Sequence, residues 1–224
     1  MPALIAAATL AVVGGTAVSS SAASRSTQVA VVRCPTTYGI SGEQRQTPPS
    51  VAVLGRPAST HGLVAYTNTF DYLIGPAGMQ CAGVVAVDGG TLIAVWPKGD
   101  PKPVEHAHEA GLTLALDPAC VGCKEDDACP FFSQFAVQEQ LSCPNGGIPP
   151  GEDAYGLTKN TTLFEDPPGV AGDGWPSGGS DPANGVVGVN VAEQSLVYRS
   201  TCTLPSVQHS ICTVVLNDVI ARYG

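Results

Sequence analysis

Residues 79–96 read MQCAGVVAV (79–87), DGG (88–90) and TLIAVW (91–96). Two runs of apolar and β-branched residues flank a three-residue loop that contains two glycines, which is the pattern of a β-hairpin. Pro97 and the polar run 98–103 end the second strand, because proline lacks the N–H that a central strand needs. This hairpin is the clearest structural signal in the chain and predicts antiparallel sheet at its centre.

Further short strands are predicted on both sides of the hairpin, separated by segments rich in glycine, proline and polar residues. They cover residues 28–33, 51–54, 63–66, 112–116, 161–164, 185–191 and 195–201. The polar stretch 35–49 is expected to be a loop. The longest turn-rich stretch runs from residue 166 to residue 184, and a loop of that length is typically functional or disordered.

Two segments are predicted to be helical. Residues 133–141 have Phe135, Ala136 and Gln140 at helical spacing, with Ser133 as a candidate N-cap. Residues 204–222 carry apolar residues three and four positions apart, at Val207, Ile211, Val214, Val215 and Val219. We therefore expect an α+β fold. It would be a single domain of mainly antiparallel sheet with one or two helices, including a C-terminal amphipathic helix, cross-linked by disulfides.

The N-terminus has the pattern of an export signal. Residues 3–18 carry no charge and are mostly Ala, Val, Leu and Ile, a run too short to span a membrane comfortably. Small residues follow, and Ser21 and Ala23 predict cleavage after Ala23. We therefore expect a signal peptide over 1–23 and one secreted, disulfide-stabilised domain over 24–224. The first basic residue is Arg25, so a misassigned start codon and an uncleaved N-terminal anchor remain alternatives.

An even number of cysteines behind an export signal is typical of a disulfide framework. Spacing favours the pairs 202–212 and 34–81, and the other four cysteines would then pair within residues 120–143. The spacing Cys120-Val-Gly-Cys123 also occurs in redox-active proteins, but the acidic run 125–127 follows it and would raise a thiol pKa. Structural disulfides are therefore expected at all eight positions, Cys34, Cys81, Cys120, Cys123, Cys129, Cys143, Cys202 and Cys212.

The chain is acidic, with a formal net charge of −9 over 224 residues. A surface of this sign repels phosphate backbones and anionic lipid headgroups, so nucleic acids and membrane surfaces are not expected partners. After cleavage of the signal peptide no membrane span is expected. The expected partner is instead an extracellular or cell-envelope ligand.

Two candidate sites stand out among the polar segments. In Glu105-His106-Ala-His108-Glu109, an extended backbone would place both histidines on one face, as zinc or copper ligands require. The sequence identifies no third ligand, and the alternative is an exposed polar strand end. Trp175, in the turn-rich stretch, could stack on a ligand or cover the core.

One short motif resembles a protease signature. Ser177-Gly178-Gly179 is similar to the Gly-Asp-Ser-Gly-Gly loop of secreted chymotrypsin-like proteases, but Pro176 stands where that family has aspartate. No motif by itself identifies a catalytic site, so the sequence does not decide whether the protein is an enzyme. We expect a non-enzymatic binding or interaction module without a cofactor. The alternative is a secreted hydrolase or a metal-dependent enzyme that uses His106 and His108.

Overall fold

The computed structural model describes residues 27–39, 46–55, 57, 59–100, 111–143, 147–172, 180–192 and 195–224. Its strands are β1 (Thr27–Arg33), β2 (Thr36–Tyr38), β3 (Ser50–Val53), β4 (Leu63–Thr67), β5 (Tyr72–Pro76), β6 (Gln80–Val85), β7 (Thr91–Trp96), β8 (Gly111–Asp117), β9 (Asp153–Thr158), β10 (Thr161–Asp166), β11 (Ala183–Asn190) and β12 (Leu196–Thr203). The helices are α1 (Val121–Ala128), α2 (Ser133–Gln138) and α3 (His209–Tyr223), with a short 3-10 helix η1 (Ser206–Gln208) before α3.

These strands form two sheets, and the α+β class expected from the sequence is confirmed. The large sheet has the order β2-β6-β7-β8-β12-β11-β10-β9, and the small sheet has the order β3-β1-β4-β5. Neighbouring strands are antiparallel except for the pairs β1–β4 and β2–β6. The predicted hairpin is present as β6 and β7, which pair from Gln80 opposite Trp96 to Val85 opposite Thr91. Gly89 in its turn has φ +86°, a conformation that favours glycine.

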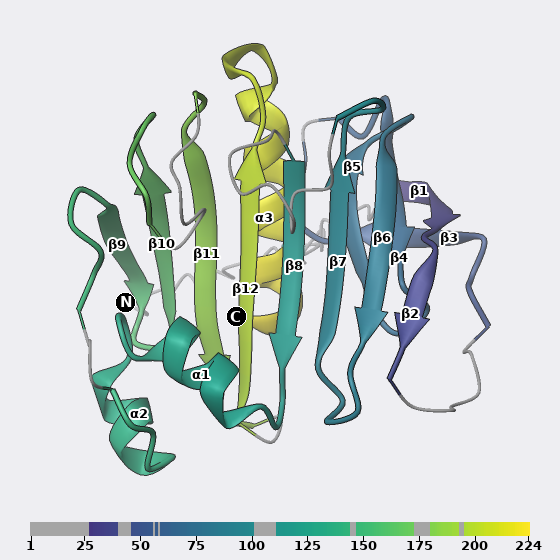
Figure 1. Ribbon diagram of the computed structural model, residues 1–224. Coiled ribbons are helices and arrows are strands. Elements are labelled where there is room, and N and C mark those ends of the chain that lie inside the picture. Colours follow the sequence, from purple (N-terminus) through teal and green to yellow (C-terminus); the bar gives the residue numbers. More distant parts are fainter. Residues whose placement is uncertain are drawn as a thin grey trace, which may run out of the picture.

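The small sheet and α3 pack against one face of the large sheet, and α1 and α2 cover part of the other (Figure 1). Successive side chains of a strand point to opposite faces of the sheet, so each face has its own set of packed residues. On β11, Val186 belongs to the core beneath α3, whereas Val187 and Val189 face the helices α1 and α2. Phe132 and Phe135 pack with these valines in a core between the large sheet and the helices α1 and α2.

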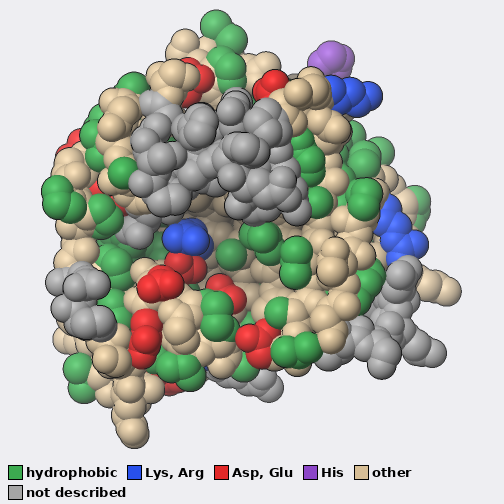
Figure 2. All heavy atoms as spheres, viewed as in Figure 1, with side chains coloured by type: hydrophobic (Ala, Val, Ile, Leu, Met, Phe, Trp, Pro, Cys, Tyr) green, Lys and Arg blue, Asp and Glu red, His purple; other side chains and the backbone are tan. Residues whose placement is uncertain are grey.

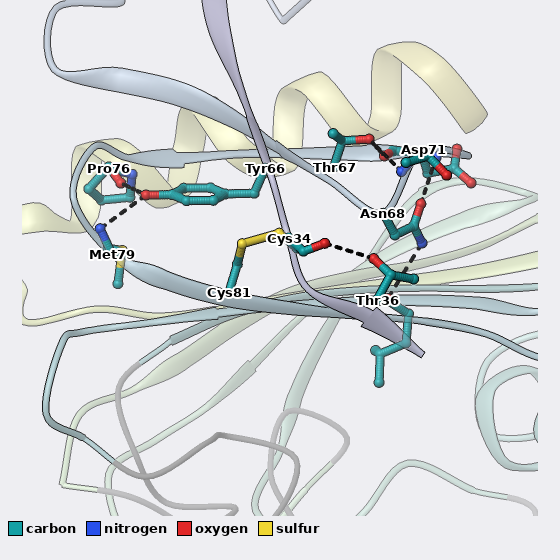
Figure 3. The surroundings of a disulfide bond; sticks show 11 residues. Cys34, Thr36, Tyr66, Thr67, Asn68, Asp71, Pro76, Met79 and Cys81 are labelled. Atoms are coloured by element: carbon teal, nitrogen blue, oxygen red, sulfur yellow. Dashed lines mark hydrogen bonds between the residues drawn. A yellow bond between two sulfur atoms is a disulfide. The ribbon is translucent and has the colours of Figure 1, made fainter. Parts of the chain in front are cut away.

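Four disulfides hold these layers together, and the pairings favoured by spacing are confirmed. Cys34–Cys81 joins the end of β1 to β6 and therefore links the two sheets (Figure 3). Cys202–Cys212 ties β12 to α3. The remaining four cysteines pair within residues 120–143, as Cys120–Cys123 and Cys129–Cys143.

Local hydrogen bonds fix the chain where it crosses between the sheets at Cys34. The Cys34 N–H donates to the Thr67 carbonyl at 2.9 Å, and the Thr36 hydroxyl donates to the Cys34 carbonyl at 2.9 Å. Tyr66, fully buried beside the disulfide, donates its hydroxyl hydrogen to the Pro76 carbonyl (Figure 3). These bonds give hydrogen-bond partners to backbone groups at the crossing, where the regular strand pairing ends.

Three local predictions are wrong. Residues 36–38 form β2 inside the predicted loop, because they pair with β6. Ser133 is the first helical residue of α2, whose N-cap is Phe132. Val207 is 88% exposed, because it lies in η1 and α3 begins two residues later.

Other predictions fall outside the described residues. These are the signal peptide over 1–23, the histidines His106 and His108, the indole of Trp175, and the motif 177–179. Among the helices of the described ranges, none is long and apolar enough to cross a membrane.

Candidate functional site: an acidic groove beside a disulfide

A groove of about 360 Å³ lies on the face of the large sheet that carries α1. Strands β6 to β8 and the residue after β6 supply an apolar floor, made by Val84, Ala86, Leu92 and Ala115. Helix α1 supplies one wall through Cys123, Asp126 and Asp127. Figure 2 shows this face, with acidic side chains gathered on and around α1.

Strand alternation places the key carboxylate of the groove. On β8, Leu114 and Leu116 are buried in the core beneath α3, so Ala115 and Asp117 point to the opposite face. Arg199 comes from the neighbouring strand β12, where it lies opposite Ala115. The two charged side chains therefore lie on the same face of adjacent strands.

The turn of the hairpin lines part of the groove through Asp88 and Gly90. Gly90 donates its N–H to Asp88 Oδ1 at 3.0 Å. A Cβ at Gly90 would lie 3.2 Å from Asp88 Oδ1 and 3.3 Å from Asp117 Oδ1. Glycine at this position therefore leaves room for two carboxylates beside the turn.

The environment of Asp117 makes it titrate near neutral pH. Burial is the largest cause, and the negative charge of Asp127 adds to it, so that the pKa of Asp117 rises to about 6. Asp88 raises the pKa further, whereas the positive charges of Arg199 and Lys124 lower it. Asp117 is therefore mainly ionised at pH 7 although it is half-buried.

Asp127 is buried and has a direct cationic partner. Its Oδ1 lies 2.9 Å from Arg199 NH1, and only 5% of its side chain is exposed. Burial raises the pKa of Asp127, and the guanidinium partly offsets that rise. Among the described lining residues, four carboxylates (Asp88, Asp117, Asp126 and Asp127) face one guanidinium, so the groove carries net negative charge.

The disulfide Cys120–Cys123 stands at the start of α1. Cys120 is the N-cap residue, and its sulfur accepts a hydrogen bond from the Cys123 N–H at 3.1 Å. A carboxylate oxygen of Asp117 and both sulfurs lie within 4.8 Å of one another. This is the closest approach to a metal-ligand cluster in the described residues, but the sulfurs are bonded to each other and offer no thiolate.

Of the residues that the sequence singled out, Cys123 lines this groove and Cys120 lies beside it. His106, His108 and Trp175 lie outside the described residues, so the zinc or copper site and the aromatic contact stay predictions. The other two histidines are on separate elements: His61 is exposed in the turn before β4, and His209 begins α3.

The sequence did not reveal the groove, because its charges come from the β6–β7 turn and from three separate elements, β8, α1 and β12. One signal was present, since Arg199 is a charged residue in the middle of an otherwise uncharged strand. Its partner Asp127 is 72 positions earlier in the chain, and nothing local connects them. Comparison with models of known protein families, with curated proteins and with solved structures gave no match.

Proposed function

We propose that this chain is an exported, disulfide-stabilised binding domain, and that its acidic groove takes the cationic end of an extracellular or cell-envelope ligand. Export is supported by the signal-peptide pattern of residues 1–23 and by four disulfides, which persist in oxidising compartments. Intact mass measured on protein from the culture medium tests it. A chain that begins at Ser24 is expected, and a chain found only inside the cell would contradict export.

The main support for a ligand with a cationic end is the combination of an apolar floor and a rim of carboxylates in the groove. The side chains of Val84, Leu92 and Ala115 can contact a hydrocarbon body, while Asp117 and Asp126 face its charged end. Two unit charges 4 Å apart near a protein surface attract by about 4 kcal/mol, most of which desolvation offsets. A primary amine on a short alkyl chain fits this chemistry.

The ionisation of Asp117 gives the binding a pH signature. A cation binds the ionised carboxylate, so its affinity is expected to rise as the pH increases through about 6. Below that pH, Asp117 holds a proton and the groove loses one negative charge. Salt should weaken the binding because part of the groove is open to water.

Three ligands with the same hydrocarbon body test the charge preference. Hexylammonium, hexanol and hexanoate are titrated into isotopically labelled protein at pH 7.5, and amide shifts are recorded by NMR. We expect hexylammonium to shift amides of β7, β8 and α1 and to bind at least fivefold more tightly than hexanol. Equal binding of hexanoate, or shifts spread over the whole acidic surface, would refute the proposal.

A pair of matched variants locates the site. Asp126→Asn removes an exposed carboxylate from the rim of the groove, and Asp153→Asn removes an exposed carboxylate from β9. Each change removes one negative charge from the protein. We expect Asp126→Asn alone to weaken hexylammonium binding, by about threefold or more. Equal weakening by Asp153→Asn would show that attraction to the overall charge explains the binding.

A further inference from the structure

The Cys120–Cys123 disulfide differs from two of its counterparts in exposure. Both cysteines are half-buried, and Val121 between them is 59% exposed. The pairs Cys34–Cys81 and Cys202–Cys212 each contain at least one sulfur-bearing residue that is less than 5% exposed. Because neither residue of the 120–123 bond is buried, we expect a thiol in solution to reach this bond without unfolding of the domain.

This disulfide also contributes least to holding the fold together. It links residues three positions apart, whereas the other pairs are 47, 14 and 10 apart. The stabilisation from loop closure grows with the number of residues enclosed, so this bond restricts the unfolded chain least. Helix α1 has other anchors, the bond Cys129–Cys143 and the ion pair between Asp127 and Arg199.

The two sulfurs have different surroundings. Cys123 lines the acidic groove. Cys120 caps the N-terminus of α1, where it accepts the Cys123 N–H. A helix N-terminus and a backbone donor both stabilise negative charge on sulfur and lower the pKa of a thiol. Cys120 is thus the better leaving group, and Cys123 is the sulfur that a molecule in the groove meets.

The acidic residues that follow the motif do not all act on Cys120. Glu125 accepts the Ser142 N–H at 2.8 Å, and Asp127 is paired with Arg199. Asp126 is exposed, where water screens its charge. The carboxylate with an oxygen within 4.8 Å of both sulfurs is Asp117, which lies on the strand before the helix.

We propose that Cys120–Cys123 is a redox-active disulfide that exchanges with thiol substrates in the acidic groove, with Cys123 as the attacked sulfur, Cys120 as the leaving group and Asp117 as the proton acceptor. The incoming thiol transfers its proton to the Asp117 carboxylate, and its sulfur bonds to Cys123 Sγ as the 120–123 bond breaks. Cys120 leaves as a thiolate and takes the proton from Asp117. A second thiol then attacks the substrate sulfur of the mixed disulfide, Cys123 leaves as a thiolate, and the proton of the second thiol passes to Cys123. The balance is two substrate thiols oxidised to one disulfide and one protein disulfide reduced to two thiols.

The full chain, purified with its disulfides intact, is exposed to 2-mercaptoethanol, quenched with an alkylating reagent and mapped by mass spectrometry. The bond Cys129–Cys143 is the internal control, because both of its cysteines are also half-buried. We expect Cys120–Cys123 to exchange at least tenfold faster, with the early mixed disulfide on Cys123. Equal rates, or a first adduct on Cys120, would overturn the proposal.

A separate measurement tests the role of Asp117. It is the ratio of the exchange rate of Cys120–Cys123 to the exchange rate of Cys129–Cys143. Both rates rise with thiolate concentration, and the ratio cancels that rise. In the native protein the ratio should increase between pH 5 and pH 7, and in Asp117→Asn it should be about tenfold lower and flat. The charged groups around Asp117 that shape this profile are Asp88, Lys124, Asp126, Asp127 and Arg199. An unchanged ratio in Asp117→Asn would refute its role as proton acceptor.

The expectation that cationic thiols are preferred rests on the binding function proposed above. Cysteamine is cationic and 2-mercaptoethanesulfonate is anionic, and each is compared through the same ratio of rates. We expect the ratio to fall from cysteamine to 2-mercaptoethanol to 2-mercaptoethanesulfonate. If the neutral thiol is selective for Cys120–Cys123 but charge has no effect, the redox role stands and the cation preference is refuted.

Discussion

Asp117→Asn is expected to stabilise the protein at neutral and alkaline pH and to leave it unchanged in acid. The folded state raises the pKa of Asp117 from 3.8 to about 6, so it holds the proton more tightly than the unfolded chain does. The wild-type protein therefore loses stability as the pH rises from about 4 to about 6. Asparagine has nearly the same shape and carries no charge at any of these pH values.

The magnitude follows from the size of the pKa change. A change from 3.8 to about 6 corresponds to at most about 3 kcal/mol. Asp117 is only half-buried, and solvent screening reduces such an effect. We therefore expect Asp117→Asn to increase the free energy of unfolding by about 1–2 kcal/mol at pH 8 and by less than about 0.5 kcal/mol at pH 3.5.

Urea unfolding followed by circular dichroism at several pH values measures this difference, with the disulfides left oxidised in both proteins. Asp153→Asn, on the exposed strand β9, controls for the loss of one negative charge from an acidic protein. A variant that is no more stable than wild type at pH 8, or a gain that persists unchanged at pH 3.5, would show that burial does not penalise the Asp117 carboxylate.

Two further variants test the packing of the core that α1 and α2 cover. Gly185→Ala would place a Cβ against the Phe164 ring and is expected to cost about 1–3 kcal/mol, whereas a Cβ at Gly156 meets no atom within 4 Å. Phe135→Ala empties part of the core under α2 and is expected to cost about 3–5 kcal/mol, against less than about 0.5 kcal/mol for Val137→Ala on the exposed side of the same helix. Urea unfolding compares Gly185→Ala with Gly156→Ala, and Phe135→Ala with Val137→Ala. Equal losses of stability within either pair would contradict the packing described.

The sequence predicted the elements whose local pattern and tertiary role agree. The hairpin β6–β7 has apolar runs, a glycine turn and a following proline, and all of these features act locally. The strand β5 (Tyr72–Pro76) was missed because Gly75 and Pro76 normally end a strand. In the fold β5 pairs with β4, and the missing Cβ of Gly75 makes room for the side chain of Leu112.

Elements stabilised mainly by other parts of the chain gave no local signal. The edge strand β9 is mostly exposed and shows no apolar alternation, yet β10 pairs along its length. Helix α1 contains a glycine and three consecutive acidic residues, none of them a strong helix signal at these positions. It is held by the cap at Cys120, by its contacts with β11 and β12, and by a disulfide one residue after its end.

Helix α1 also explains why the sequence favours an inert Cys120–Cys123 disulfide whereas the structure supports the proposal of a redox-active one. In the sequence, residues 125–127 are a block of negative charge next to Cys123, which favours an inert disulfide. The helix turns each successive side chain by about 100 degrees, so the three carboxylates point to Ser142, to water and to Arg199. The charge near the sulfurs comes instead from Asp117, on a strand that the sequence predicted without its register. Proximity along the chain therefore pointed to the wrong carboxylates, because electrostatic effects on a thiol depend on distance and screening in the folded protein.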